Sequence, residues 1–142
     1  MSSSPVIRVA AGLLFRAGRL LIAQRLPDSH LGGLWEFPGG KLETGETHAE
    51  CLVRELREEL DVEVEALEQI AEARHAYPEK SVEIVFLRCR WLKNEPRPVQ
   101  CANIAWVGRD ELDRFPFPPA DAGILDVLTR NERLWRSGPA GR

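Results

Sequence analysis

The chain has 142 residues, of which 44% are hydrophobic and 29% charged, and its formal net charge is −3. This balance predicts one globular domain over residues 1–142, with frayed tails at 1–4 and 137–142. Acidic residues outnumber basic ones by 22 to 19, which argues against a nucleic-acid polymer as partner. No stretch is long and apolar enough to span a membrane. We therefore expect a cytoplasmic monomer or homodimer.

The cysteines and histidines give no sign of a soft-metal site. Cys51, Cys89 and Cys101 are odd in number and lack C-x-x-C spacing, so they are interpreted as reduced thiols rather than disulfides or zinc ligands. Three scattered histidines are interpreted as structural or solvated: His30, His48 and His75.

The first half of the chain alternates apolar residues with turn signals. Strands are predicted over residues 7–15 and 20–24, joined by a turn, and a short strand is predicted over 34–37. A glycine loop at Gly39–Gly40 follows this short strand. Thr47 and Glu50 then form a capping box, which predicts a helix over residues 48–60.

This helix has an apolar stripe and an acidic cluster. The stripe predicted to be buried comprises Ala49, Leu52, Val53, Leu56 and Leu60. The acidic residues Glu55, Glu58 and Glu59 crowd the last turns, where the helix dipole disfavours anions. Like charges at this spacing repel by roughly 0.2–0.5 kcal/mol per pair, so the cluster opposes helix stability unless a cation neutralises it.

Carboxylate oxygens suit Mg²⁺ or Mn²⁺ rather than zinc. A charged helix face is ordinarily solvated surface. The preceding glycine loop, and Glu46 at a fixed offset from the helix, favour a metal site over that alternative, because surface charge needs neither. A backbone carbonyl of the glycine loop could add a ligand.

The second half of the chain is rich in strands and ends in a helix. The predicted elements are one or two strands over 62–75, a turn at 77–80, a strand over 82–92, a polar loop over 93–101, a strand over 104–107, a helical turn at 110–113, a proline-rich loop at 116–119 and a helix from Asp121 to about Trp135. Its expected inward residues are Ile124, Leu125, Leu128 and Leu134. This order supports a mixed α/β or α+β domain.

The segment from the glycine loop through the acidic helix resembles the signature of the Nudix family. The matching positions are Gly40, Glu46, Arg54, Glu55, Leu56, Glu58, Glu59 and Val62. Asp61 stands where the family has glycine, and aspartate tolerates the left-handed geometry of a helix end better than most residues. Residues 36–41 and 117–121 are similar to the MutT branch of nucleoside triphosphate pyrophosphohydrolases.

The resemblance implies an α/β/α sandwich around a mixed sheet, and hydrolysis of a nucleoside triphosphate to a monophosphate and pyrophosphate with Mg²⁺ (or Mn²⁺). We assign the metal to the Gly39 carbonyl with Glu55, Glu58 and Glu59. Glu55 is the first choice for the base that activates water, and Glu46 is the alternative. Arg54 is expected to orient Glu55 through its fixed fork of donors.

Several residues are candidates for binding the substrate. Arg25 and Lys41 would contact phosphates, although either could be a surface charge, and Lys80 could add local positive charge. Tyr77 and Phe117 could line the base, or could be core aromatics. MutT-type enzymes have a further glutamate where this chain has Gln100, whose amide can ligate a metal but cannot take a proton.

Asp121 bears on the choice of base. In the MutT branch this position is an asparagine that reads oxidised guanine by donating and accepting. Ionised aspartate only accepts, which suits an exocyclic amine, and the CTP pyrophosphohydrolase branch also has aspartate there. The hypothesis is a preference for cytidine-type nucleotides over 8-oxo-dGTP. A protonated Asp121 could donate, and Asp121 could instead cap the last helix.

Two other functions remain open at this point. One is a Nudix hydrolase acting on ADP-ribose, a dinucleoside polyphosphate or a capped RNA end, against which the short chain and the MutT-like C-terminal segment argue. The other is a non-catalytic Nudix-like nucleotide-binding domain, which should not require Glu55, Glu58 and Glu59 together.

Overall fold

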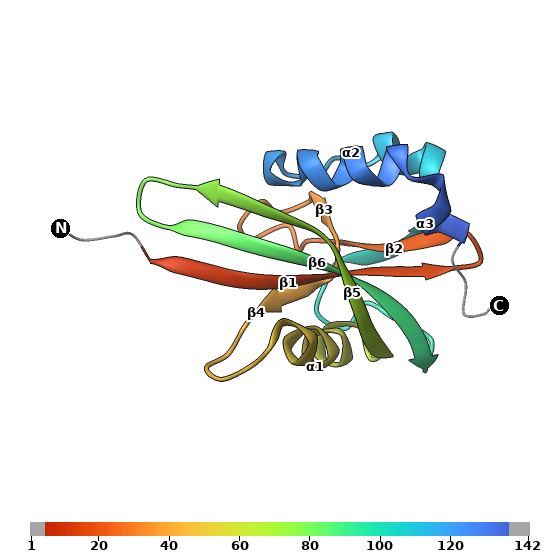
Figure 1. Cartoon of the computed structure of the whole chain (residues 1–142), viewed down its shortest axis with the longest axis horizontal. Helices are drawn as coiled ribbons and strands as arrows, with labels where there is room; N and C mark the ends of the chain where they lie inside the picture. Colours follow the sequence, from red (N-terminus) through yellow and green to blue (C-terminus); the bar gives the residue numbers. More distant parts are fainter. Residues whose placement is uncertain (1–4, 137–142) are drawn as a thin grey trace.

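The computed structural model describes residues 5–136, and its sheet carries helices on both faces (Figure 1). Helix α1 (His48–Leu60) lies on one face, and α2 (Ala122–Arg130) and α3 (Glu132–Arg136) lie on the other. The α/β/α sandwich expected from the resemblance is therefore confirmed. The tails expected to fray lie outside the described residues. Within 5–136, no helix combines the length and apolar content that crossing a membrane requires.

Seven strands form one mixed sheet in the order β3-β2-β1-β6-β5, with β4 paired to β1 and β7 paired to β2. Strand β1 runs parallel to β6 and antiparallel to β2 and β4. The strands are β1 (Val6–Arg16), β2 (Arg19–Gln24), β3 (Trp35–Glu36), β4 (Gly39–Lys41), β5 (Glu63–Ala76), β6 (Ser81–Lys93) and β7 (Asn103–Val107). Two short 3-10 helices, η1 (Arg109–Arg114) and η2 (Pro119–Asp121), lead into α2.

Each face of the sheet has its own apolar core. The core under α1 includes Ala10, Leu14, Leu52, Leu56, Leu60 and Leu87. The core under α2 and α3 includes Leu13, Phe37, Phe86, Ile124, Leu128 and Trp135. Strand β1 supplies alternate side chains to both cores, as a buried central strand must.

The glycine loop forms a strand that the sequence did not predict. Gly39 and Gly40 pair with Ala11 and Ala10 of β1. A Cβ atom on residue 39 would lie 1.9 Å from the carbonyl oxygen of Ala10, so only glycine can approach β1 this closely. This pairing fixes β4 beside the first turns of α1.

The prediction of a single C-terminal helix was wrong. The helix breaks at Asn131, whose side-chain amide donates to the carbonyl of Val127 at 2.8 Å. The break turns α3 back toward the sheet. There the indole of Trp135 is buried, donates to the carbonyl of Leu128 at 2.9 Å and meets the ring of Phe15 edge-on.

The predicted apolar stripes need smaller corrections. In α1, Ala49 is exposed and Val53 is only half-buried, and Cys51 is the buried residue of the first turn because it faces the carbonyl of Gly40. In the C-terminal helices, Leu125 and Leu134 are half-buried. The structure holds residues 63–76 as one strand with local register shifts.

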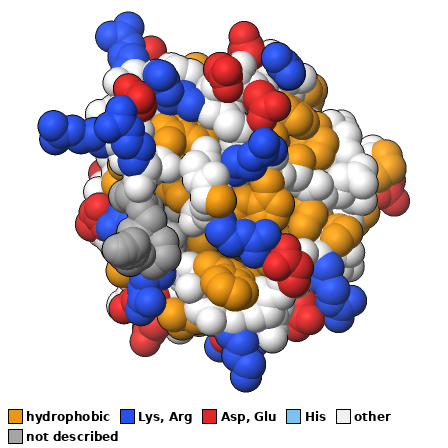
Figure 2. All heavy atoms as spheres, turned by 90° about the vertical axis from the view of Figure 1, so that its right-hand side faces the viewer, with side chains coloured by type: hydrophobic (Ala, Val, Ile, Leu, Met, Phe, Trp, Pro, Cys, Tyr) orange, Lys and Arg blue, Asp and Glu red, His pale blue; other side chains and the backbone are white. Residues whose placement is uncertain are grey.

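The end of the molecule at the right of Figure 1 carries apolar patches between basic and acidic side chains (Figure 2). Strands β1 and β6 end there. Trp91 is 40% exposed, and Arg16 lies 4.2 Å over the ring of Trp106 while it pairs with Glu95 through two hydrogen bonds. Arginine thus covers part of the aromatic surface at this end.

Candidate active site

Arg54 lies at the centre of the acidic cluster. Its Nε and Nη2 donate to the two oxygens of Glu46 at 2.7 and 3.0 Å. Its Nη1 donates to Glu55 at 3.1 Å and to Glu58 at 3.3 Å. The hydrogen bonds from Arg54 are the largest cause that lowers the pKa of Glu46 to about 2, followed by one from the backbone of Glu43. A carboxylate with so low a pKa accepts protons poorly.

Glu55 and Glu59 lie together where α1 meets β4. A Cβ atom on residue 40 would lie 2.3 Å from the carboxyl carbon of Glu55, so Gly40 makes room for that carboxylate. Burial, and then the neighbouring Glu55 and Glu36, raise the pKa of Glu59 well above its usual range. Such crowding of desolvated acids is unfavourable without a counter-charge.

These donors fit a hard divalent cation. The oxygens of Glu55, Glu59 and the Gly39 carbonyl are of the kind that Mg²⁺ prefers. Glu58 is half-exposed and pairs with Arg54 through one carboxylate oxygen at 3.3 Å. Among residues 5–136, no three acidic, histidine or cysteine side chains already converge as a complete metal-binding group.

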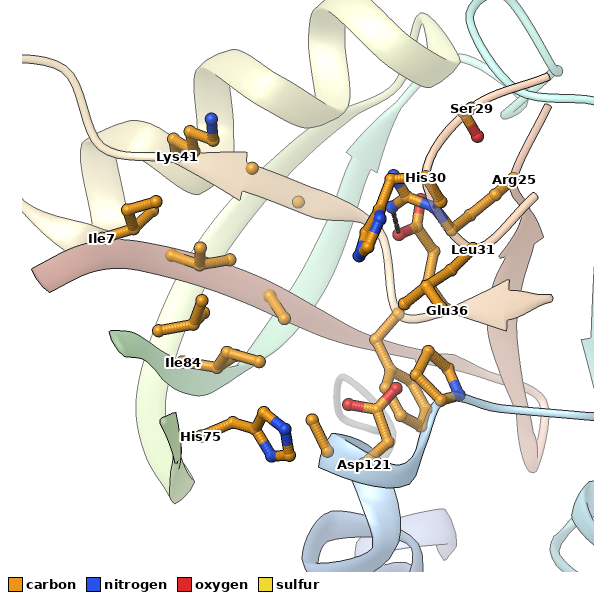
Figure 3. Close-up of a pocket in the computed structure, with 18 of the residues that line it drawn as sticks. Ile7, Arg25, Ser29, His30, Leu31, Glu36, Lys41, His75, Ile84 and Asp121 are labelled. Atoms are coloured by element: carbon orange, nitrogen blue, oxygen red, sulfur yellow. Dashed lines mark hydrogen bonds and ion pairs between the residues drawn. The ribbon is translucent and has the colours of Figure 1, made fainter. Parts of the chain in front are cut away.

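A cleft of about 580 Å³ extends along the sheet from this cluster (Figure 3). Its apolar floor includes Ile7, Val9, Val82 and Ile84 from the parallel strands β1 and β6. The residues predicted for substrate or metal that line it are Arg25, Gly39, Lys41, Glu59, Tyr77, Lys80 and Asp121. Residues from seven separate segments of the chain therefore share one cavity.

The remaining predicted site residues lie outside the cleft lining. Glu46, Arg54, Glu55 and Glu58 form the hydrogen-bonded cluster at its border. Phe117 stacks on Phe37, with ring centroids 5.1 Å apart, and belongs to the core under α2. This position supports the alternative that Phe117 is a core aromatic. Its ring packs against Phe37, which lines the cleft.

Asp121 is a buried residue whose carboxyl has no hydrogen-bond partner among the described residues but opens onto the cleft. Its side chain is directed into the cleft (Figure 3), and the residue is 7% exposed. No residue within 5–136 gives its carboxyl a hydrogen bond, and it does not cap α2. Burial, and then the charge of Glu36, raise the pKa of Asp121 to about 7. The carboxyl oxygens of Asp121 are therefore free to hydrogen-bond a ligand that enters the cleft.

Three cleft residues were not assigned a role from the sequence. Glu36 lines the cleft and pairs with Arg25 at 2.7 Å. His75, interpreted as structural, faces the cleft and lies against the ring of Tyr77. His30 lines the same cavity. His75 lies near the end of β5, and Tyr77 follows directly after the last residue of that strand, Ala76. Their spacing of two residues is the only sequence signal for this contact.

A family model described as the NUDIX domain matches residues 10–127 of this chain. The chain belongs to the Nudix family. It is 36% identical over 126 residues to a CTP pyrophosphohydrolase of Escherichia coli K12, covering 87% of this chain and 91% of that protein. It is 38% identical over 96 residues to an 8-oxo-dGTP diphosphatase of Proteus vulgaris, covering 67% and 86% of the two chains.

Solved structures of other proteins agree with this fold. The solution structure of the E. coli ORF135 protein has a TM-score of 0.82 and 31% identity, and the match covers 94% of this chain and 96% of that one. A MutT protein of Methanosarcina mazei Go1 has the same TM-score at 20% identity, covering 94% and 99%, and shows likeness of fold alone. The family predicted from the signature is thus confirmed, and with it the assignment to a class of hydrolases.

Proposed function

We propose that this Nudix protein is an Mg²⁺-dependent pyrophosphohydrolase that converts a nucleoside triphosphate and water to a nucleoside monophosphate and pyrophosphate. The observation that carries the proposal is a single cleft lined both by Glu59, which lies beside Glu55 of the carboxylate cluster, and by the unpartnered Asp121. The carboxylate oxygens would hold a metal ion that binds the phosphates. Asp121 offers a polar group to the nucleobase. The relatives named as pyrophosphohydrolase and diphosphatase support the same reaction.

In this proposal the residues of α1 and β4 divide the work. When bound, Mg²⁺ offsets charge on the phosphoryl oxygens and acidifies its water. Glu55 takes the proton of the attacking water, and Arg54 holds the carboxylate of Glu55 in place. Lys41, at the cleft wall, contacts the phosphates. The three free thiols of the described chain fit a cytoplasmic location.

Asp121 supports a cytidine-type substrate. As a carboxylate it accepts hydrogen bonds only, which matches an exocyclic amine such as N4 of cytosine. With a pKa near 7, its protonated form is also present at neutral pH and could donate to an oxidised guanine. We therefore place CTP or a deoxycytidine triphosphate first and 8-oxo-dGTP second.

A nucleotide screen tests both parts of the proposal. Pyrophosphate release is measured with Mg²⁺ for CTP, 5-methyl-dCTP, 2-hydroxy-dATP and 8-oxo-dGTP, in the native protein and in Asp121→Asn. We expect a cytidine nucleotide to be hydrolysed best by the native protein, and Asp121→Asn to shift preference toward 8-oxo-dGTP. Dominance of 8-oxo-dGTP in the native protein would refute the base assignment.

The Glu55→Gln variant separates catalysis from mere binding. We expect it to abolish pyrophosphate release while the nucleotide still binds, because the amide cannot accept a proton. A native protein that binds these nucleotides but releases no pyrophosphate would instead be a non-catalytic Nudix domain. Hydrolysis of ADP-ribose to AMP and ribose 5-phosphate, or cleavage of a dinucleoside polyphosphate, without hydrolysis of any of these triphosphates would point to the other hydrolase function.

A further inference from the structure

The mouth of the cleft is formed by a compact loop between β2 and β3, residues 26–33, here named the rim loop. Arg25 closes its base, because the backbone amide of Arg25 donates to Leu34 at 2.9 Å and its carbonyl accepts from Gly33 at 3.2 Å. Four rim-loop residues line the cleft: Leu26, Ser29, His30 and Leu31.

The side chain of Arg25 ties the rim loop to the sheet. Its Nε donates to the carbonyl oxygen of His30 at 2.6 Å, and its Nη1 donates to the carboxylate of Glu36 at 2.7 Å. Figure 3 shows these three residues together at the mouth of the cleft, with Lys41 farther along it. The guanidinium is thus already engaged by the protein, unlike a cation held open for phosphates.

The ion pair between Arg25 and Glu36 affects the other acidic residues of the cleft. Burial raises the pKa of Glu36, and Arg25 opposes that effect. Glu36 in turn acts on the carboxyls of both Asp121 and Glu59. Arg25 is therefore the cation that lets Glu36 remain in a wall already crowded with acids.

The rim loop is tightly folded and presents apolar side chains to solvent. Leu31 has a φ of 56°, a left-handed conformation that is unfavourable for leucine. A Cβ atom on residue 32 would lie 2.3 Å from the carbonyl oxygen of Pro27. Leu26 is 43% exposed and Leu31 is 38% exposed. Strain and exposed apolar surface at a cleft mouth are features of segments that contact ligands.

We infer that Arg25 is a positioning residue that latches the rim loop over the nucleoside part of the substrate, and that Leu31 is an apolar contact to that nucleoside. The inference rests on the proposed function. It gives Arg25 a positioning role in place of the phosphate contact expected from the sequence. A loop fixed before binding loses less conformational freedom when the nucleoside arrives. The latch therefore acts on nucleoside affinity and leaves the affinity for pyrophosphate unchanged.

Inhibition constants distinguish a latch from a phosphate contact. Hydrolysis of the best nucleotide is inhibited with cytidine in one series and with inorganic pyrophosphate in another. We expect Arg25→Ala to raise the inhibition constant of cytidine roughly tenfold, the effect of losing a charged hydrogen bond, and that of pyrophosphate by less than roughly twofold. Arg25→Lys should resemble Arg25→Ala, because lysine lacks the fork.

Arg88→Ala is the matched control, since Arg88 also pairs with a glutamate but lies outside the cleft. It should leave both inhibition constants unchanged. If Arg25→Ala weakens pyrophosphate as much as cytidine, and Arg25→Lys restores both, Arg25 is a phosphate contact and the latch is wrong.

Limited proteolysis tests the latch without any activity. Thermolysin, which cuts before leucine, should cleave between residues 25 and 31 faster in Arg25→Ala than in the native protein or Arg88→Ala, with all three melting cooperatively. Cleavage at the native rate would overturn the latch. Faster cleavage in a protein that hydrolyses no nucleotide would support the latch and refute the proposed function.

Leu31→Asn tests the apolar contact separately. Asparagine tolerates the left-handed conformation, so the rim loop should keep its resistance to thermolysin. We expect the inhibition constant of cytidine to rise roughly fivefold, in line with the loss of a partly buried leucine contact. An unchanged constant would remove Leu31 from the nucleoside site.

Discussion

The carboxyl of Asp121 is present in both its protonated and its ionised form near neutral pH. Its pKa is raised to about 7 because burial penalises its charge and Glu36 adds repulsion. Arg25 partly offsets Glu36, and His75 lines the same cavity from β5. Below this pKa the carboxyl both donates and accepts hydrogen bonds, and above it the carboxylate only accepts.

The base preference of the native protein should therefore change with pH. The ratio of kcat/KM for CTP to that for 8-oxo-dGTP should rise from about pH 6 to about pH 8, as Asp121 loses its proton. Initial rates at saturating Mg²⁺ measure this ratio. Asp121→Asn has no proton to lose, so its ratio should stay flat. A native ratio that is equally flat would contradict the shifted pKa.

At the scale of elements, helix α1 is held at both ends by features beyond its apolar stripe. The capping box of Thr47 and Glu50 forms as predicted. At the other end Asp61 adopts the left-handed conformation with a φ of 59°, in place of the family's glycine. The loop that follows β6 donates backbone amides of residues 97, 99 and 100 to the last carbonyls of α1. The acidic residues thus stand on a helix that both ends keep in place.

Mg²⁺ should stabilise the protein through this helix. A ligand that binds only the folded state raises the melting temperature by linkage, so millimolar Mg²⁺ should increase it. Differential scanning calorimetry with and without Mg²⁺ measures the rise. Exchanging both Glu58 and Glu59 for glutamine should shrink the rise, whereas Glu65→Gln on β5 should not. A native melting curve indifferent to Mg²⁺ would argue against metal binding in the free protein.

The same elements show what a sequence can reveal. Periodicity and the capping box located α1, since both depend on residues close in the chain. The strand at Gly39–Gly40 was not predicted because it forms by pairing with β1. Local residue preferences carry no information about pairing with a strand elsewhere in the chain. The engagement of Arg25 with His30 and Glu36 also escaped notice. It depends on how the rim loop folds back, and Arg25 by itself has the appearance of a phosphate contact.

The sequence did not reveal the electrostatic interaction between Asp121 and Glu36, because the two residues lie far apart in the chain. The sequence left three possibilities for Asp121, an ionised acceptor, a protonated donor or a helix cap, because nothing near it in the chain indicates burial close to Glu36. Only the stacking of η2 over the sheet brings the two acids within electrostatic reach. The family signature, by contrast, identified the carboxylate cluster directly, since its residues lie within one helix and the loop before it.

At the scale of the whole molecule, the core under α2 and α3 brings together residues from the first strand and from the last described helix. Trp135 lies in the core under α2 with 5% exposure, where its ring meets Phe15 and its indole nitrogen binds the carbonyl of Leu128. This contact joins the C-terminal helix to the first strand. Trp135 does not line the cleft.

Replacing Trp135 with alanine should lower the free energy of unfolding by about 3–5 kcal/mol, the usual cost of removing a large buried aromatic. Urea denaturation followed by circular dichroism measures the change. The exposed Trp91→Ala should cost less than about 1 kcal/mol. KM should stay near the native value for Trp135→Ala under conditions where it remains folded. A cost similar to that of Trp91→Ala would show that α3 does not hold the core together.

The central place of β1 also constrains how a nascent chain can fold. Strand β1 is synthesised well before its parallel neighbour β6, which ends only at Lys93. Until that residue has left the ribosome, the apolar faces of β1 lack a main partner, and α1 waits beside an incomplete sheet. The sheet can therefore form only late, once both strands are available. A translational pause before residue 93 would leave the apolar faces of β1 exposed to chaperones or to aggregation.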